Sequence, residues 1–190
     1  MFKPKYTLTN SIVKDLTIIS ECKAIISRAK ILPSAEIKLK RQALTRMSQS
    51  STAIEGNQLN LNQVEAIIAG KTIDAPDRDI YEVKNYLSAL KYIEKIVKNK
   101  QKITTKTILQ IHKYVTQNTL SKEQSGCFRQ GPVYVVRHFM GLNKKVIYTA
   151  PPAPSVLKLV ADLVDWINEI KTLDIRPVII AGVVHQEIAA

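Results

Sequence analysis

The residues that could do chemistry in this chain are few, and they form no recognisable reactive set. The three histidines, His112, His138 and His185, stand in no metal-ligand spacing with Cys, Asp or Glu. The sequence contains no P-loop and no dinucleotide-binding fingerprint, and no Ser-His-Asp or Cys-His set can be placed in it. His112 lies on an apolar helical stripe, so we interpret it as a core histidine with satisfied hydrogen bonds. The residues alone therefore indicate neither a catalytic set nor a metal site.

The stretch SSTAIEGN, residues 50–57, is the segment whose charge conflicts with its predicted structure. Helical periodicity places Glu55 in the last turn of a helix. The partial negative charge of a helix C-terminus disfavours an acidic side chain there by about 0.3–1 kcal/mol. A glutamate in that place indicates a cationic partner elsewhere. The alternative from the residues alone is an exposed glutamate that faces water.

Length and composition set the class of protein. Apolar residues make up 45% of 190, which suits a globular chain with a core and excludes disorder over most of its length. The longest near-apolar run, from Pro177 to Val184, is too short for a membrane span. The first residues, MFKPKYTLTN, lack the apolar region of a signal peptide. Cys22 and Cys127 are too few for a disulfide framework, so we expect a cytoplasmic protein with no membrane partner.

The charge balance is strongly basic, with 28 Lys and Arg against 16 Asp and Glu, a formal net charge of +12. In the densest basic stretch, KYIEKIVKNKQK, the lysines alternate with Ile and Val at helical spacing. This pattern is typical of the solvated face of an amphipathic helix. A nucleic-acid patch is the competing interpretation, and binding with a steep salt dependence would favour it.

The 3.6-residue period of apolar residues predicts helices through most of the chain. Ser34 is the expected N-cap of the second helix, and Gly70 is expected to end the third. The apolar pattern of the last helix runs to Ala190 without a capping Gly or Asn, so we expect a chain that is cut within a helix. The predicted helices lie around residues 12–26, 34–54, 61–70, 80–97, 108–115, 156–170 and 177–190.

The turn between the second and third predicted helices carries several local signals. Gly56 stands where a C′ glycine ends a helix. Asn60 and Gln63 have the spacing of a capping box, and Leu59 and Val64 have that of a hydrophobic staple.

The pattern changes after Gly126. The runs 133–136 and 146–148 are β-branched and aromatic, and the loop between them holds Gly141 and Asn143, which predicts a β-hairpin. The segment 150–154, rich in proline, is expected to be an extended connector. The predicted fold class is all-α with one inserted β-hairpin.

The segment from Ser51 to Gly56 resembles the inhibitory motif S-x-x-x-E-G of the Fic family. Its surroundings, MSQSSTAIEGNQLNLNQVEAIIAGK, are similar to the N-terminal region of that family. Later segments resemble the regions that follow, in the same order, so the resemblance covers nearly the whole chain. These segments are DIYEVKNYLSALKYI, GCFRQGPVYVV, YTAPPAPSVLKLVADLVDWIN and RPVIIAGVVHQEIAA.

The chain departs from the family in one respect: the signature HPFx(D/E)GNGR is absent. The resemblance places the signature histidine just beyond Ala190, and His185 corresponds to a histidine upstream of it in the same helix. It therefore implies a chain that is truncated before the signature and is inactive alone.

The resemblance implies a protein adenylyltransferase, which transfers AMP from ATP to a Ser, Thr or Tyr hydroxyl of a target protein. ATP and Mg²⁺ are the implied cofactors, and the Mg²⁺ ligand is not in this chain. Glu55 is the implied brake, paired with a signature arginine where the ATP γ-phosphate would lie. Ser51, on the same helix face, could tie the helix to the core or be an ordinary helix contact. Gly56 and Asn57 are placed near ATP, although their local pattern favours cap and turn roles.

The resemblance also assigns the domains. Residues 1–75 would be an N-terminal region with the inhibitory helix, and residues 76–190 an incomplete Fic core, so the fold would be a Fic-type helical bundle. The hairpin at about 132–149 would be the flap, against which a target segment aligns as an added strand. Arg129 could anchor the base of the flap or be a surface arginine. The expected docking residues are Val133, Tyr134, Val135 and Val136.

The remaining expectations concern partners. A target protein is implied, a homodimer is open, and DNA would bind only through a downstream segment. Two other functions compete with the enzyme fragment. One is an antitoxin-like binding module that supplies Glu55 in trans to another Fic core, and the other is a basic nucleic-acid-binding protein.

Overall fold

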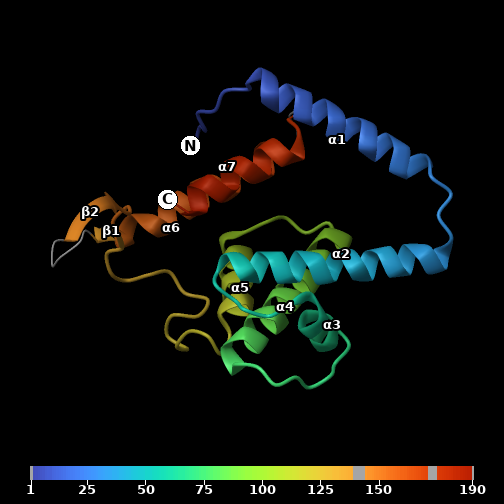
Figure 1. Ribbon diagram of the computed structural model, residues 1–190. Coiled ribbons are helices and arrows are strands. Elements are labelled where there is room, and N and C mark those ends of the chain that lie inside the picture. Colours follow the sequence, from blue (N-terminus) through green and yellow to red (C-terminus); the bar gives the residue numbers. More distant parts are fainter. Residues whose placement is uncertain (1, 139–143, 171–174, 190) are drawn as a thin grey trace. The chain divides into compact units, whose positions relative to one another are not determined.

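The computed structural model describes residues 2–138, 144–170 and 175–189 (Figure 1). The chain divides into two compact units, Pro4–Ile73 and a second made of Met1–Lys3 with Asp74–Ala190. The described residues form seven helices and one two-stranded antiparallel sheet. The predicted fold class, all-α with one inserted hairpin, is therefore confirmed.

The unit Pro4–Ile73 contains three helices: α1 (Asn10–Arg28), α2 (Pro33–Ile54) and α3 (Leu61–Ile68). Within this unit α2 packs against α3, whereas α1 packs against neither. The apolar stripe that predicts α1 is observed, but α1 has no buried residue. Its exposed apolar side chains are Val13, Ile18, Ile19, Ile25 and Ile26.

The start of α2 differs from the prediction. Leu32 is the N-cap, Pro33 is the first helical residue, and no side chain caps the helix, so the assignment of Ser34 as N-cap is wrong. A proline fits the first helical position because its missing N–H would have no helical partner there. Glu36 favours the same end through the helix dipole and lies 2.6 Å from the Lys40 ammonium. Its hydrogen bond to Lys40 lowers the pKa of the Glu36 carboxyl.

The buried face of α2 is lined by small hydroxyl residues. Thr45, Ser48 and Thr52 are all buried. Each donates its hydroxyl to the carbonyl four residues earlier, on Arg41, Leu44 and Ser48, at 3.0, 2.8 and 2.9 Å. These bonds satisfy the hydroxyls locally, so α2 can bury polar but small side chains and approach its neighbours closely.

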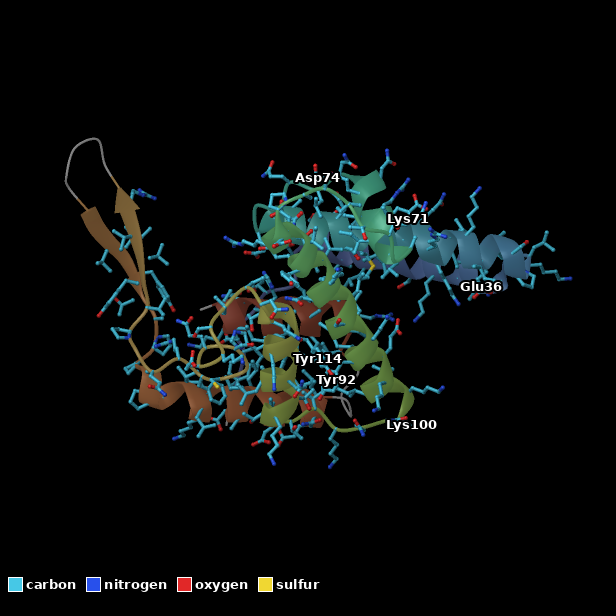
Figure 2. The ribbon with its side chains drawn as sticks, turned by 90° about the horizontal axis from the view of Figure 1, so that it is seen from below. Glu36, Lys71, Asp74, Tyr92, Lys100 and Tyr114 are labelled. Atoms are coloured by element: carbon cyan, nitrogen blue, oxygen red, sulfur yellow. The ribbon has the colours of Figure 1, made fainter. Side chains whose placement is uncertain are left out.

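The second unit contains α4 (Asp77–Lys98), α5 (Thr105–Thr116), α6 (Ala153–Ile170) and α7 (Pro177–Ala189). Helices α4 and α5 run side by side (Figure 1), α5 packs against α6, and α6 against α7. The rings of Tyr92 and Tyr114 face each other across the α4–α5 contact with centroids 5.3 Å apart (Figure 2). The buried apolar residues of this unit are Val83, Ala89, Ile96, Leu163, Val164, Ile167 and Ile170.

Two asparagine side chains tie helices to neighbouring backbone. The buried Asn85 of α4 donates its amide to the carbonyls of Val115 and Gln117, at 3.3 and 2.6 Å. These carbonyls lie at the C-terminal end of α5, where no helical donor is available. Asn168 of α6 donates to the carbonyl of Ile103 at 2.7 Å, just before α5. The amides therefore fix both ends of α5 within the unit.

The start of α6 also differs from the prediction. The helix begins at Ala153, so the expected extended connector is wrong for its last two residues. Pro154 fits the first turn, where a backbone N–H is not needed. The helix predicted from Pro177 is confirmed as α7. Among the described residues no helix combines the length and the apolarity that crossing a bilayer requires.

The hairpin consists of β1 (Tyr134–His138) and β2 (Lys144–Thr149), paired antiparallel. The predicted loop with Gly141 and Asn143 lies outside the described residues. The pairing register shifts between Val135 and Val136: Val135 pairs with Tyr148, whereas Val136 pairs with Val146. Ile147 is therefore the extra residue of a β-bulge in β2, which increases the local twist of that strand.

The connection from α5 to the hairpin folds back onto α5 at Gly126. The Gly126 N–H donates to Nδ1 of His112 at 3.1 Å, so His112 has a hydrogen-bond partner as predicted, although it is half-buried rather than in the core. Gly126 has a φ of +73°, and an added Cβ would stand 2.8 Å from Cβ of Lys113. Both the backbone angle and the space therefore require glycine.

We predict that Gly126→Ala lowers the free energy of unfolding by about 2–4 kcal/mol, because a left-handed alanine and a clash with α5 both cost energy. Gly131→Ala is the matched control, since Gly131 lies in the same connection, has open space and has no positive φ. It should change stability by less than about 0.5 kcal/mol. Urea unfolding followed by circular dichroism measures both, and equal effects would contradict the prediction.

Candidate functional site

The C-terminal end of α2 is closed by a Schellman turn. Glu55 is the C-cap residue, and Gly56 follows at C′ with a φ of +94°. The Asn57 N–H donates to the Thr52 carbonyl at 3.2 Å, and the Gly56 N–H to the Ala53 carbonyl at 3.0 Å. This pair of bonds defines the motif. The prediction that Gly56 ends the helix is confirmed.

The segment after the turn is fixed by side-chain caps. Asn57 is buried, and its Oδ1 accepts from the Leu59 N–H at 3.0 Å. Asn60 and Gln63 form the predicted capping box, each accepting from the backbone N–H of the other at 3.0 Å. Leu59 and Val64 are both buried, as a hydrophobic staple requires. The path of the chain from α2 into α3 is therefore locally determined.

Glu55 is exposed at this fixed helix end. It takes part in none of the salt bridges found among the described residues, which join Lys40 to Glu36, Arg41 to Glu65 and Arg78 to Glu82. Its carboxylate therefore adds negative charge to the negative end of the helix dipole without compensation there. A cation that pairs with Glu55 stays a prediction.

The other predicted residues of this segment have clear local positions. Ser51 is half-buried in the last turn of α2. Gly56 and Asn57 act as cap and turn residues. Their expected proximity to ATP stays a prediction. Sequence reasoning missed the neighbouring hydroxyls of Ser48 and Thr52, whose spacing of four residues was the available signal.

The described residues do not fit a nucleotide or metal site by themselves. In the parts of the chain that the structure describes, no three His, Cys, Asp or Glu side chains come together. The signature HPFx(D/E)GNGR is absent from the sequence. The exposed carboxylate of Glu55, at the negative end of a helix, repels phosphate rather than holding it.

The hairpin presents apolar side chains to solvent on both of its strands. Such a surface is unusual for an isolated two-stranded ribbon, which has little stability of its own. The hairpin belongs to the second unit, whereas residues 51–57 belong to the first. Its exposed apolar residues include the four predicted docking residues and are Val133, Tyr134, Val135, Val136, Val146, Ile147 and Tyr148.

The base of the hairpin is held by Arg129. Its guanidinium donates through Nη1 to the Gly131 carbonyl at 3.0 Å and through Nη2 to the Pro151 carbonyl. These acceptors lie just before β1 and just after β2. The Ala150 N–H donates to the Val133 carbonyl at 3.0 Å and extends the ladder by one bond. Of the two interpretations of Arg129, the anchor is therefore confirmed.

Comparison with known proteins places the chain among Fic proteins. No family model matches it. It is 29% identical over 173 residues to protein adenylyltransferase Fic of Drosophila willistoni, covering 87% of this chain and 32% of that protein. It is 31% identical over 147 residues to protein adenylyltransferase fic-1 of Caenorhabditis briggsae, covering 73% and 26%. The chain thus spans about a third or less of the curated relatives that it matches.

Two solved structures share the fold. A Fic family protein from Desulfovibrio desulfuricans G20 matches with a TM-score of 0.72 and 30% identity, over 98% of this chain and 53% of that one. A fragment of Fic-1 from Caenorhabditis elegans, carrying a glutamate-to-glycine substitution, matches with a TM-score of 0.70 and 24% identity, over 93% and 52%. The second likeness shows the fold alone.

We predict that Glu55→Gln raises the free energy of unfolding by about 0.3–1 kcal/mol, because it removes an uncompensated charge from a helix C-terminus. Glu21→Gln is the control, since it makes the same change of net charge in the middle of α1 and should have no effect. Chemical denaturation of both variants provides the comparison. A gain no larger than that of the control would mean that a cation already compensates Glu55.

We also predict that Arg129→Ala speeds hydrogen exchange of the Ala150 amide roughly ten- to hundredfold, because hydrogen bonds from a charged group are worth about 1.5–3 kcal/mol. Arg137→Ala serves as control, because this arginine of β1 makes no such bonds with the described residues. The exchange rate is measured by NMR. An unchanged rate in the Arg129 variant would show that strand pairing holds the base of the hairpin without Arg129.

Proposed function

Because this chain belongs to the Fic family, we propose that it serves a protein adenylyltransferase whose activity Glu55 restrains. The curated relatives that it matches are named protein adenylyltransferases. Such an enzyme takes AMP from ATP and attaches it to a Ser, Thr or Tyr hydroxyl of a target protein, with Mg²⁺ assisting at the phosphates. The signature is absent from these residues, so their contribution is the brake and the docking flap.

The observation that carries the proposal is the exposed carboxylate of Glu55 at a rigidly closed helix end. The Schellman turn at Gly56 fixes the backbone from which the Glu55 side chain projects, because the backbone on both sides is hydrogen-bonded. Its charge excludes a second anionic group, such as the γ-phosphate of ATP, from the place that it occupies. An arginine of the family signature is the cation proposed to pair with it.

The strength of such a brake can be estimated. A charge-assisted hydrogen-bonded pair is worth about 1.5–3 kcal/mol. A bias of about 2.7 kcal/mol leaves roughly 1% of the molecules competent to bind the nucleotide productively. Ser51, half-buried one turn earlier, is proposed to keep α2 in register with the core.

The flap is proposed to dock the target. An extended segment that adds to the hairpin gains main-chain hydrogen bonds whatever its sequence, and so brings a hydroxyl to a fixed position. The exposed apolar residues Val133, Tyr134, Val135 and Val136 support this role, since an added strand would cover them. A homodimer of the whole protein stays open.

We propose a cytoplasmic location for the protein. The support is that Cys22 and Cys127 are both exposed and unpaired. Exposed free thiols suit a reducing compartment.

A second function has a specific observation in its favour. Glu55 is exposed and the signature is absent from the sequence, so this chain could supply its glutamate to the Fic core of another protein. It would then be an antitoxin-like inhibitor in trans. Co-purification of the chain with a second Fic protein supports this function over the first.

We predict that Glu55→Gly in the intact protein raises AMP transfer roughly tenfold or more, because the competent fraction rises from about 1%. Labelling from radioactive ATP, of the protein itself or of its target, is the measurement. Glu21→Gln is the control, because it removes an exposed carboxylate from α1, which does not pack against α2.

Equal labelling by the parent and the Glu55 variant would refute the brake. Labelling that is absent from both would count against AMP transfer by this protein. In that case, inhibition of a separate Fic enzyme by the parent chain, lost with Glu55→Gly, would support the inhibitor in trans.

A further inference from the structure

The flap region carries positive charge only. From Gln124 to Ala161 the sequence has no Asp or Glu, although the chain as a whole has 16. The same stretch holds five basic residues. They are Arg129, Arg137, Lys144, Lys145 and Lys158. Arg129 is used at the base of the hairpin, which leaves the strands themselves with three cations and no counter-charge.

The register of the hairpin brings two of these cations together. Arg137 of β1 pairs directly with Lys145 of β2, and His138 pairs with Lys144 in the next step towards the loop. Arg137 and Lys145 are both exposed, and neither makes a salt bridge with a described residue. Like charges directly opposite each other destabilise a ribbon. Stability therefore does not account for this pair, and a bound anionic group would.

The same face of the hairpin has an apolar part. Residues two apart on a strand share a face, so Val135 lies on the face of Arg137, and its partner Tyr148 lies there too. Both Val135 and Tyr148 are exposed. One face of the ribbon therefore has an apolar patch near the base. A basic patch lies on the same face, two residues further along β1 towards the loop.

The two free edges of the hairpin are not equivalent. The bulge at Ile147 interrupts the regular spacing of β2, whereas β1 runs without interruption from Tyr134 to His138. A bulge twists an edge away from further pairing. An added strand is therefore expected along β1.

We propose that the flap selects an acidic extended segment of the target protein, docked along β1, with an acidic side chain directly opposite Arg137 and on the same face as Lys145, which lies across β1. An apolar side chain two positions away on the same segment lies opposite Val135, on the face that Tyr148 shares. The inference rests on the proposed function for the identity of the segment as a target. The binding preference itself depends only on the hairpin.

The charge pattern favours this occupant over others. A second copy of the hairpin would bring the same cations together, with no Asp or Glu from residues 124–161 to offset them. A nucleic acid would supply negative charge but no backbone donors and acceptors for the free edge of β1. An acidic protein segment supplies both.

The test measures binding of two fluorescein-labelled extended peptides to the 190-residue chain by anisotropy, without ATP. Both peptides are rich in Thr and Val, and they differ only in carrying Glu or Gln at two alternate positions. The Glu peptide should bind roughly threefold to tenfold more tightly, as expected for exposed charge pairs. The preference should shrink as ionic strength rises.

Paired variants locate the preference. Arg137→Glu with Lys145→Glu should remove or reverse it. Lys91→Glu with Lys95→Glu, the same charge change on exposed positions of α4, should leave most of it. The folding of each double variant is checked by circular dichroism. If Arg137→Glu with Lys145→Glu perturbs the hairpin, Arg137→Gln with Lys145→Gln neutralises the two charges without reversing them.

Equal binding of the two peptides, no binding of either, or a preference that survives both flap double variants would overturn the proposal. So would tighter binding of a short duplex DNA that the same variants abolish, because the patch would then belong to nucleic acid. AMP transfer that fails while the Glu preference persists would refute the proposed function and leave the selectivity of the flap intact.

Discussion

The left-handed backbone of Gly56 is the constraint on which the first unit depends. It lets the chain reverse within the six residues 52–57, so that the Asn57 N–H can reach back to the Thr52 carbonyl. That single turn ends α2, buries Asn57 and starts the cap of α3. It also fixes the point on the backbone from which the Glu55 side chain projects. Backbone geometry thus determines which helix end carries this charge.

The hairpin is fixed by a different means. Its described side chains are exposed on both strands, so apolar packing contributes little to it. Hydrogen bonds at its base replace packing: one guanidinium spans the residues that flank β1 and β2, and one added ladder bond closes the ribbon. The connection is tied to α5 through Gly126 and His112. The ribbon is therefore anchored at one end and leaves its faces and edges available.

Features that depend on neighbouring residues could be predicted from the sequence. The Asn60–Gln63 capping box, the C′ glycine and the strand runs follow from local backbone chemistry, and each is observed. Ser34 was misassigned because a proline at the first helical position competes with a side-chain cap. The buried hydroxyl face of α2 could not be predicted, because burial depends on neighbouring elements that the periodicity of one helix does not identify. The stripe on α1 illustrates the same limit, since it indicates a helix but not what covers it. The role of Arg129 could not be predicted for the same reason, because its acceptor, the Pro151 carbonyl, is distant in sequence.

The pleat of β1 has a consequence for the chemistry of any segment that pairs with it. Successive side chains of a docked strand point to opposite sides, so moving the segment by one residue exchanges every inward group for an outward one. Where two hydroxyl residues are adjacent in a target, only one of them can face the transferred group in a given pairing. A strand that binds a target segment by main-chain hydrogen bonds would thus present only every second residue of that segment to the transferred group. It would discriminate between adjacent residues even though the main-chain bonds are the same for every amino acid.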